Sequence, residues 1–199
     1  MSVVLADYYK ECYGKPPLGK PCVRCVHIQR TRNHMEIRRT NLIQYGDTDM
    51  RRTIFSILTA GAFATIAFDA FGQALSPLFG YAKLAPVGLA GATLKSVFGA
   101  APSGAAHLLH TLTGLIFYVI GYYIIARPVQ RAVLPQLHWA ITAIVYGVAL
   151  WIFALYGMAH LVAGMKPFLG FTGITWVALV GHVLYGIVMV AVMRLFQKV

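Results

Sequence analysis

The sequence predicts an all-α fold, a bundle of four transmembrane helices in a polytopic membrane protein. Four apolar runs, at residues 53–75, 104–126, 137–163 and 172–193, each approach or exceed the roughly 20 residues that a helix needs to cross ~30 Å of hydrocarbon. Only 12% of the 199 residues are charged and 58% are hydrophobic, which is about half the charge of a soluble domain. Because backbone polar groups in lipid must be satisfied within their own segment, each run is expected to be a helix in contact with the lipid bilayer.

Basic residues and prolines mark the limits of these runs. Arg51 and Arg52 stand directly before the first run. Pro128 follows the second run, Pro135 precedes the third, and Pro167 separates the third from the fourth. This punctuation agrees with the limits of the four runs.

The distribution of lysine and arginine predicts the topology. The net charge is +11, but beyond residue 49 the bases lie at or between the ends of the runs and do not form the basic face that a nucleic-acid partner requires. One side of the predicted bundle collects Arg51, Arg52, Arg127, Arg131, Arg194 and Lys198, and the other collects Lys83, Lys95 and Lys166. The positive-inside rule therefore predicts that both termini are cytoplasmic.

Residues 76–103 are predicted to form an outer loop between the first two runs. The segment is apolar but is interrupted by prolines and glycines, and it carries Lys83 and Lys95. Such punctuation breaks a continuous span. A short helix is expected over 84–99, either lying in the membrane interface or re-entering the membrane.

Residues 1–49 differ from the rest of the chain, residues 50–199. They are polar and hold no long periodic run, so we expect a disordered cytoplasmic extension. Met50, followed by two arginines and an apolar run, is typical of the start of a small bacterial membrane protein. A mis-assigned start at residue 1 is therefore the alternative interpretation.

Cys22 and Cys25 form the single CxxC pair of this extension and are its candidate metal ligands. A structural zinc site needs four thiolate or imidazole ligands. A c-type haem needs histidine directly after the second cysteine, where Val26 stands. Neither requirement is met by the sequence around this pair.

Five ionisable residues inside the runs are the candidate functional residues. Charged and imidazole side chains are costly in a bilayer, and by default they mark functional sites. At a rise of ~1.5 Å per residue, four of them are expected in one outer layer, with the fifth close to mid-membrane. In chain order they are Asp69, His107, His110, His160 and, at mid-membrane, His182.

Helical spacing places these residues on stripes that are predicted to face the bundle interior. Residues three or four apart share one face of a helix, and small residues mark close helix contacts in membranes. The four stripes are Gly61, Thr65, Asp69 and Gly72; His107, His110, Gly114, Phe117 and Gly121; Tyr146, Leu150, Phe153, Gly157 and His160; and Ala178, His182, Tyr185 and Met189.

Several interpretations of this polar cluster remain open. Hydrogen bonds between helices could fix their register, at about 0.6–2 kcal/mol each. The cluster could instead relay protons in a proton or small-solute transporter, with Asp69 as proton acceptor. It could also bind haem or a transition metal in a redox protein, for which His107 and His160 are the nearest candidate pair. An accessory subunit of a larger membrane complex is a separate class, which glycine-rich faces would suit. A homo-oligomer is the other assembly that we consider.

Signatures of common enzyme classes are missing from the sequence. It contains no glycine-rich phosphate loop, no Gly-x-Ser-x-Gly elbow and no HExxH motif, each of which carries a defined chemistry. We assign no catalytic residue and expect a protein that is not an enzyme.

Three motifs resemble a known group of proteins. They are GAAHLLH at 104–110 with Gly114 and Tyr118, Tyr146-Gly147 with Leu150-Trp151, and GHVLYG at 181–186. In these motifs the chain is similar to small bacterial inner-membrane proteins of the YagU-like type, and the resemblance covers residues 50–199. It implies a four-helix protein of the bacterial cytoplasmic (inner) membrane, and it supplies no reaction, substrate or cofactor.

Overall fold

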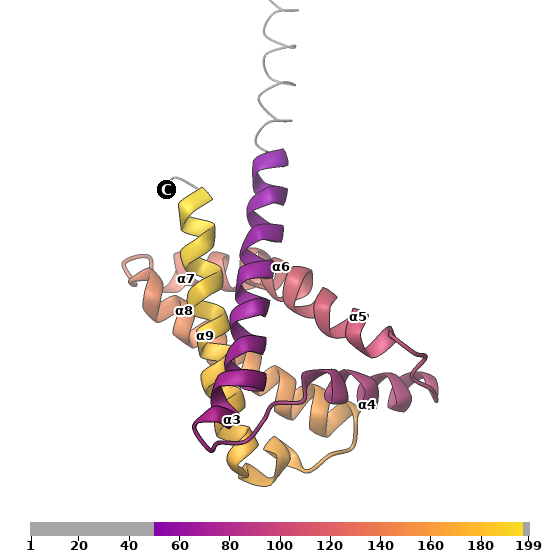
Figure 1. The fold of residues 1–199 in the computed structure, drawn as a ribbon. Helices are drawn as coiled ribbons and strands as arrows, with labels where there is room; N and C mark the ends of the chain where they lie inside the picture. Colours follow the sequence, from indigo (N-terminus) through magenta and orange to yellow (C-terminus); the bar gives the residue numbers. More distant parts are fainter. Residues whose placement is uncertain (1–49, 197–199) are drawn as a thin grey trace, which may run out of the picture. The chain divides into compact units, whose positions relative to one another are not determined.

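The computed structural model describes residues 50–196, and every regular element in this range is a helix. Arg52–Val199 forms one compact unit. Four helices are long and apolar enough to cross a membrane (Figure 1): Met50–Leu78, Ala105–Val133, Trp139–Val162 and Gly173–Phe196, the first to fourth spans. The predicted all-α fold with four spans is confirmed, and the chain is a polytopic membrane protein.

Three of the spans contain π-helical turns, whose backbone hydrogen bonds join residues five apart and which often occur at functional sites. The first span ends in the π-helical η1 (Ala70–Leu75) and the short α3 (Ser76–Leu78). The second comprises α5 (Ala105–Leu112), the π-helical η2 (Thr113–Phe117), α6 (Tyr118–Gly121), the π-helical η3 (Tyr122–Ala126) and α7 (Arg127–Val133). The third joins α8 (Trp139–Ile152) to the π-helical η4 (Phe153–Val162), and the fourth is α9 (Gly173–Phe196).

The second span is longer than the sequence indicated. The apolar run was predicted to end at Ala126, and the helix continues beyond it through Arg127 and Pro128 to Val133. Pro128 lies in the first turn of α7, directly after η3. A first turn tolerates proline because the missing N–H is not needed there, and local π turns adjust the backbone around proline in membrane helices.

A shorter helix, α4 (Pro86–Phe98), occupies the predicted helical part of the connection between the first two spans. It packs against both α5 of the second span and η4 of the third (Figure 1). Ser96 Oγ donates a hydrogen bond of 2.6 Å to the Val162 carbonyl, and a Cβ added at Gly91 would lie 3.6 Å from the Ala106 methyl. The helix α4 therefore lies between the second and third spans and keeps α5 apart from η4.

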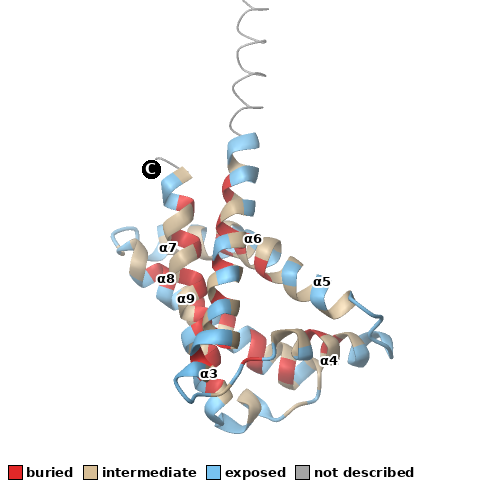
Figure 2. Cartoon of the chain, viewed as in Figure 1, coloured by how far each residue is buried: buried red, intermediate tan, exposed pale blue. Residues whose placement is uncertain are grey.

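Glycines form the closest helix crossings in the bundle. A Cβ on Gly61 of the first span would overlap the backbone of Leu115 in the second. A Cβ on Gly147 of α8 would lie 2.6 Å from the His182 carbonyl oxygen of α9. Buried residues are concentrated along the first span, α8 and α9 (Figure 2), and α9 is the most buried span while the second is the least. Close backbone approach without a side chain is the usual way in which helices associate in membranes.

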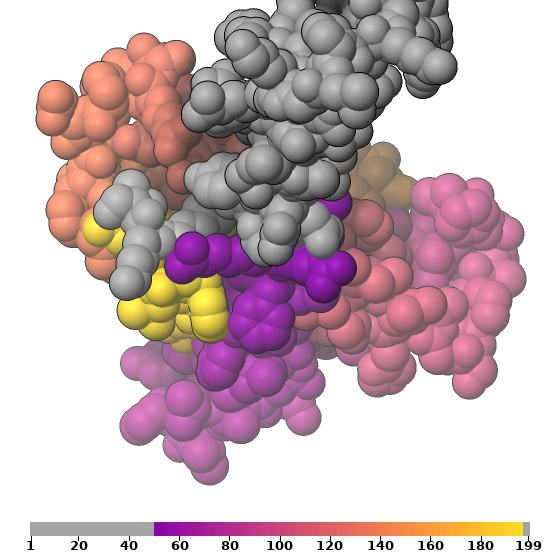
Figure 3. Space-filling model, turned by 90° about the horizontal axis from the view of Figure 1, so that it is seen from above, coloured from indigo at the N-terminus to yellow at the C-terminus, as the bar shows by residue number. Residues whose placement is uncertain are grey.

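The start of the first span and the end of the fourth lie together. Arg52 Nε donates to the Phe196 carbonyl at 3.1 Å, and the rings of Phe55 and Phe196 meet edge to face at 5.5 Å between centroids. In Figure 3 the yellow atoms of the C-terminal part of α9 lie beside the indigo atoms of the first span. These two spans are therefore antiparallel neighbours.

The connection between the third and fourth spans contains a left-handed turn, η5 (Pro167–Phe171). Three residues that are not glycine, Phe168, Leu169 and Phe171, have φ between 48° and 55°. Each such residue costs roughly 1–2 kcal/mol relative to right-handed backbone. Packing and hydrogen bonds compensate: the Phe168 ring lies 4.9 Å from that of Trp151, and Thr175 Oγ1 donates to the Phe168 carbonyl at 2.6 Å.

Replacing Thr175 by valine is expected to lower the free energy of unfolding by about 1 kcal/mol, because an enclosed hydrogen bond that holds this turn is lost without a change in side-chain shape. Thr175 is fully buried. Unfolding of the purified protein in mixed micelles would measure the change. Thr172→Val is the matched control, since exposed Thr172 makes only a 3.3 Å bond to the Leu169 carbonyl; equal losses in both variants would contradict the assignment.

Candidate functional site

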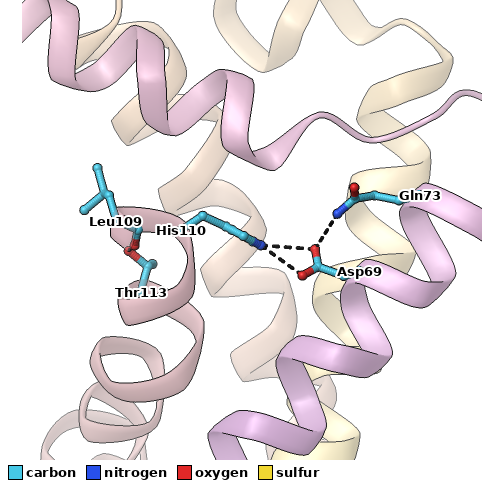
Figure 4. Close-up of polar contacts among 5 residues, drawn as sticks. All are labelled: Asp69, Gln73, Leu109, His110 and Thr113. Atoms are coloured by element: carbon cyan, nitrogen blue, oxygen red, sulfur yellow. Dashed lines mark hydrogen bonds and ion pairs between the residues drawn. The ribbon is translucent and has the colours of Figure 1, made fainter. Parts of the chain in front are cut away.

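The carboxyl group of Asp69 and the imidazole of His110 form a pair between the first and second spans. His110 Nε2 lies 3.1 Å from Oδ1 and 3.2 Å from Oδ2 of Asp69. Gln73, one helical turn after Asp69, donates from Nε2 to Oδ1 at 2.8 Å. In Figure 4 the imidazole and the amide approach the carboxyl group from different directions. Asp69 thus has one local partner and one partner on another span.

Local backbone geometry brings this pair together. Asp69 is the last residue before η1, and His110 lies in the last turn of α5, three residues before η2 begins. The first and second spans approach closely because Gly114 leaves room for the Thr65 side chain, which a Cβ would overlap. The side chains of His110 and Asp69 are 16% and 32% exposed, respectively. Such partial burial makes a net charge at this site costly in a bilayer.

A cavity of about 580 Å³ lies beside His110, between the second and third spans. Most of its lining is apolar. The first span contributes Phe68, α4 contributes Leu89 and Ala90, the second span contributes His110, Phe117 and Gly121, and the third contributes Tyr146, Leu150 and Phe153. The cavity exists because α4 separates α5 from η4, so the two spans do not close on each other.

The cavity opens sideways between the spans. Three of its lining residues, Phe117, Ile125 and Phe153, are 56%, 62% and 51% exposed. They belong to transmembrane helices, so the surface that they expose is in contact with lipid chains. A molecule dissolved in the bilayer can therefore reach the cavity without crossing water.

His110 differs from the three lining residues whose hydroxyl groups are hydrogen-bonded to backbone carbonyls. Thr93 and Thr113 donate to the carbonyls four residues earlier in their own helices. Tyr146 Oη donates to the Tyr118 carbonyl at 2.5 Å. His110 alone among these four residues combines an acidic partner with a place in the cavity wall.

His160 and His182 are bonded to backbone carbonyls. His182 is 6% exposed, its Nδ1 lies 2.7 Å from the Ala178 carbonyl, and its ring meets Phe68 at 5.0 Å. His160 Nδ1 lies 2.7 Å from the Met165 carbonyl. Of the five predicted candidates, the structure therefore joins Asp69 to His110. His160 and His182 are instead bonded to backbone carbonyls.

The remaining candidates lie elsewhere. His107 is exposed on α5, three residues before His110, because α4 packs on the neighbouring Ala106. Within residues 50–196, no three side chains of His, Cys, Asp or Glu come together as a metal-binding group. Cys22 and Cys25 lie outside the described residues.

Comparisons of the chain with protein-family models, curated proteins and solved structures give no match. The resemblance to the YagU-like type therefore stays a prediction. The candidate site is therefore defined by two structural features alone, the Asp69–His110 pair and the cavity that His110 borders.

Two parts of the site were missed by sequence reasoning. Gln73 stands four residues after Asp69, and this spacing on one helix face is a signal that could have identified it. The contribution of α4 to the cavity, through Leu89 and Ala90, has no such signal, because alanine and leucine in an apolar helix indicate packing of any kind.

Proposed function

We propose that this membrane protein binds a lipophilic small molecule of the bilayer, whose polar group reaches His110. The observation that carries this proposal is the lateral cavity of about 580 Å³, apolar over most of its lining and bordered by His110 of the Asp69–His110 pair. Ligand pockets in proteins have this composition, a mostly apolar surface with a few placed polar groups that orient the ligand.

The chemistry of the lining favours a lipophilic ligand over a polar solute. A path for polar solutes or ions requires polar groups along its length, since each buried polar group without a partner is costly. Thr93, Thr113 and Tyr146 direct their hydroxyl groups to backbone carbonyls. An apolar molecule with a hydrogen-bonding group at one end matches what remains, namely a long apolar wall with the imidazole of His110 and the phenol of Tyr118.

Replacing Ala149 by tryptophan is expected to abolish binding by filling the cavity. Ala149 lines the cavity and is exposed, so the larger ring has room to enter it without displacing the core. We expect lipophilic molecules that co-purify with the protein to fall by roughly tenfold, because the burial that holds them is removed. Organic extraction followed by mass spectrometry, in ratio to protein, measures this.

Ala132→Trp is the matched control, because Ala132 is exposed on α7 and does not line the cavity. It should retain the co-purified molecules, and both variants should unfold at the temperature of the natural sequence. The same molecules at the same ratio in both variants would refute a ligand site in this cavity.

A further inference from the structure

One ring nitrogen of His110, Nδ1, takes no part in the contact with Asp69. Nε2 makes both contacts with Asp69, and Nδ1 has no hydrogen-bond partner among residues 50–196. The side-chain nitrogen and oxygen atoms in this range that are fully enclosed without a partner are Ser56 Oγ, Thr65 Oγ1 and Thr142 Oγ1. The Nδ1 atom is not among them, so it is not fully enclosed, and His110 is one of the residues that line the cavity.

Electrical neutrality decides whether Nδ1 donates or accepts. The pair lies within two membrane spans and is only partly exposed, where an uncompensated charge is strongly disfavoured. Gln73, the other partner of Asp69, is neutral. Three arrangements of the pair are neutral. In one of them a protonated Asp69 accepts from Nε2, and its own proton then points away from the imidazole, where Gln73 offers a donor and no acceptor. The other two use every hydrogen bond of the pair: an ionised Asp69 with a doubly protonated imidazole, or a protonated Asp69 that donates to Nε2.

Both of these last two arrangements place a proton on Nδ1. In the first, both ring nitrogens of the imidazolium are donors; in the second, Nε2 accepts and Nδ1 carries the remaining proton. With an ionised Asp69, the tautomer in which Nδ1 is an acceptor leaves a net charge of −1 on the pair. Nδ1 of His110 is therefore a hydrogen-bond donor in both arrangements, whichever atom holds the shared proton.

We infer that the ligand is a lipophilic carbonyl compound, such as a long-chain ketone, quinone or ester, whose carbonyl oxygen accepts a hydrogen bond from His110 Nδ1. This inference rests on the proposed function, since it names the chemical class that the same cavity takes. The cavity wall surrounds the hydrocarbon part of the ligand, and the imidazole fixes the position of its one polar group.

Two probes of nearly equal shape test the inference. They are 4′-octylacetophenone, which has a ketone oxygen, and 1-ethyl-4-octylbenzene, which has hydrogens in its place. Binding to the full chain in lipid nanodiscs, measured by equilibrium partition against empty nanodiscs, is expected to favour the ketone by roughly tenfold, the value of one hydrogen bond in an apolar site. Equal binding of both probes, or a preference for the hydrocarbon, would overturn the carbonyl assignment.

Two substitutions test whether a preference for the ketone comes from a hydrogen bond to His110 or from a difference in solubility between the probes. His110→Phe keeps a flat ring but removes the donor, so the preference for the ketone should disappear. Asp69→Asn should keep it, because Gln73 donates to Oδ1 as before and the new amide donates to His110 Nε2, which leaves the proton on Nδ1. Loss of the preference in the Asp69→Asn variant would show that the donor is not set in this way, and would count against the inference.

Failure of the inference and failure of the proposed function give different results. If the cavity binds ligands but not through His110, both probes bind equally, and Ala149→Trp abolishes both. If the cavity binds nothing, neither probe partitions into protein-containing nanodiscs above the empty ones, and Ala149→Trp changes nothing.

Discussion

Replacing Gly61 by alanine is expected to lower the free energy of unfolding by about 1–3 kcal/mol, at the upper end of this range because backbone atoms block the new methyl group. A Cβ at this position would overlap the Leu115 carbonyl oxygen, and it would also lie 2.8 Å from the Leu115 Cα. A side chain could rotate away, but the backbone of a helix cannot. The first and second spans must therefore separate.

The same substitution is expected to weaken the candidate site. Asp69 and His110 lie on the two spans that meet at Gly61. Their hydrogen bond is 3.1 Å long, so a separation of the helices would lengthen it beyond bonding distance. We expect Gly61→Ala to lose the preference for the ketone probe as well as stability. Gly157→Ala is the matched control, since its Cβ would meet only the Phe153 ring at an ordinary 3.6 Å; a comparable loss there would show that any added methyl is harmful.

Replacing Gly147 by alanine is expected to have a similar effect on the contact between α8 and α9. A Cβ there would lie 2.6 Å from both the His182 carbonyl oxygen and the Val183 Cα. The opposing Gly186 has no room for a Cβ either, because it would overlap the Ala143 carbonyl. We expect a loss of about 1–3 kcal/mol in the free energy of unfolding, since overpacking forces the helix backbones to move.

Unfolding in mixed micelles, followed by tryptophan fluorescence or circular dichroism, measures this loss. Gly91→Ala provides the control, because its Cβ would contact only the Ala106 methyl, at 3.6 Å. A Gly147→Ala variant as stable as the control would mean that α8 and α9 are not packed this closely.

The stripe predicted for the fourth span matches its buried face. Ala178, His182, Tyr185 and Met189 are all buried, with exposures of 6% or less. α9 is one uninterrupted α-helix, so a spacing of three and four residues keeps one face along its whole length. In this span, the sequence pattern alone identified the face that packs in the bundle.

The stripes of the second and third spans predict the face that the two spans share. They do not predict that a cavity lies between these faces. His110, Phe117 and Gly121 of one stripe and Tyr146, Leu150 and Phe153 of the other line the same cavity. Phe117 and Phe153 nevertheless remain more than half exposed, because α4 packs between α5 and η4 and prevents closure. Which residues of two apolar helices touch, and which are held apart, depends on a third helix.

The partner of Asp69 is likewise determined by the tertiary structure. His107 and His110 have similar sequence contexts and predicted depths, yet only His110 meets the carboxyl group. Its place follows from the rotation of α5, which is fixed by the contact of α4 with Ala106 and by the glycine crossing with the first span.

The sequence by itself determined the number of spans, their approximate limits, the set of residues from which the pair was drawn and the buried face of the fourth span. These follow from hydrophobicity, helical period and the cost of polar groups in lipid, which are local properties of the chain. Only the tertiary structure decided the pairing of Asp69 with His110 and the open cavity beside it. Both depend on the rotation and separation of helices, which are set by contacts between residues distant in sequence, such as Gly61 with Leu115 and Ser96 with Val162.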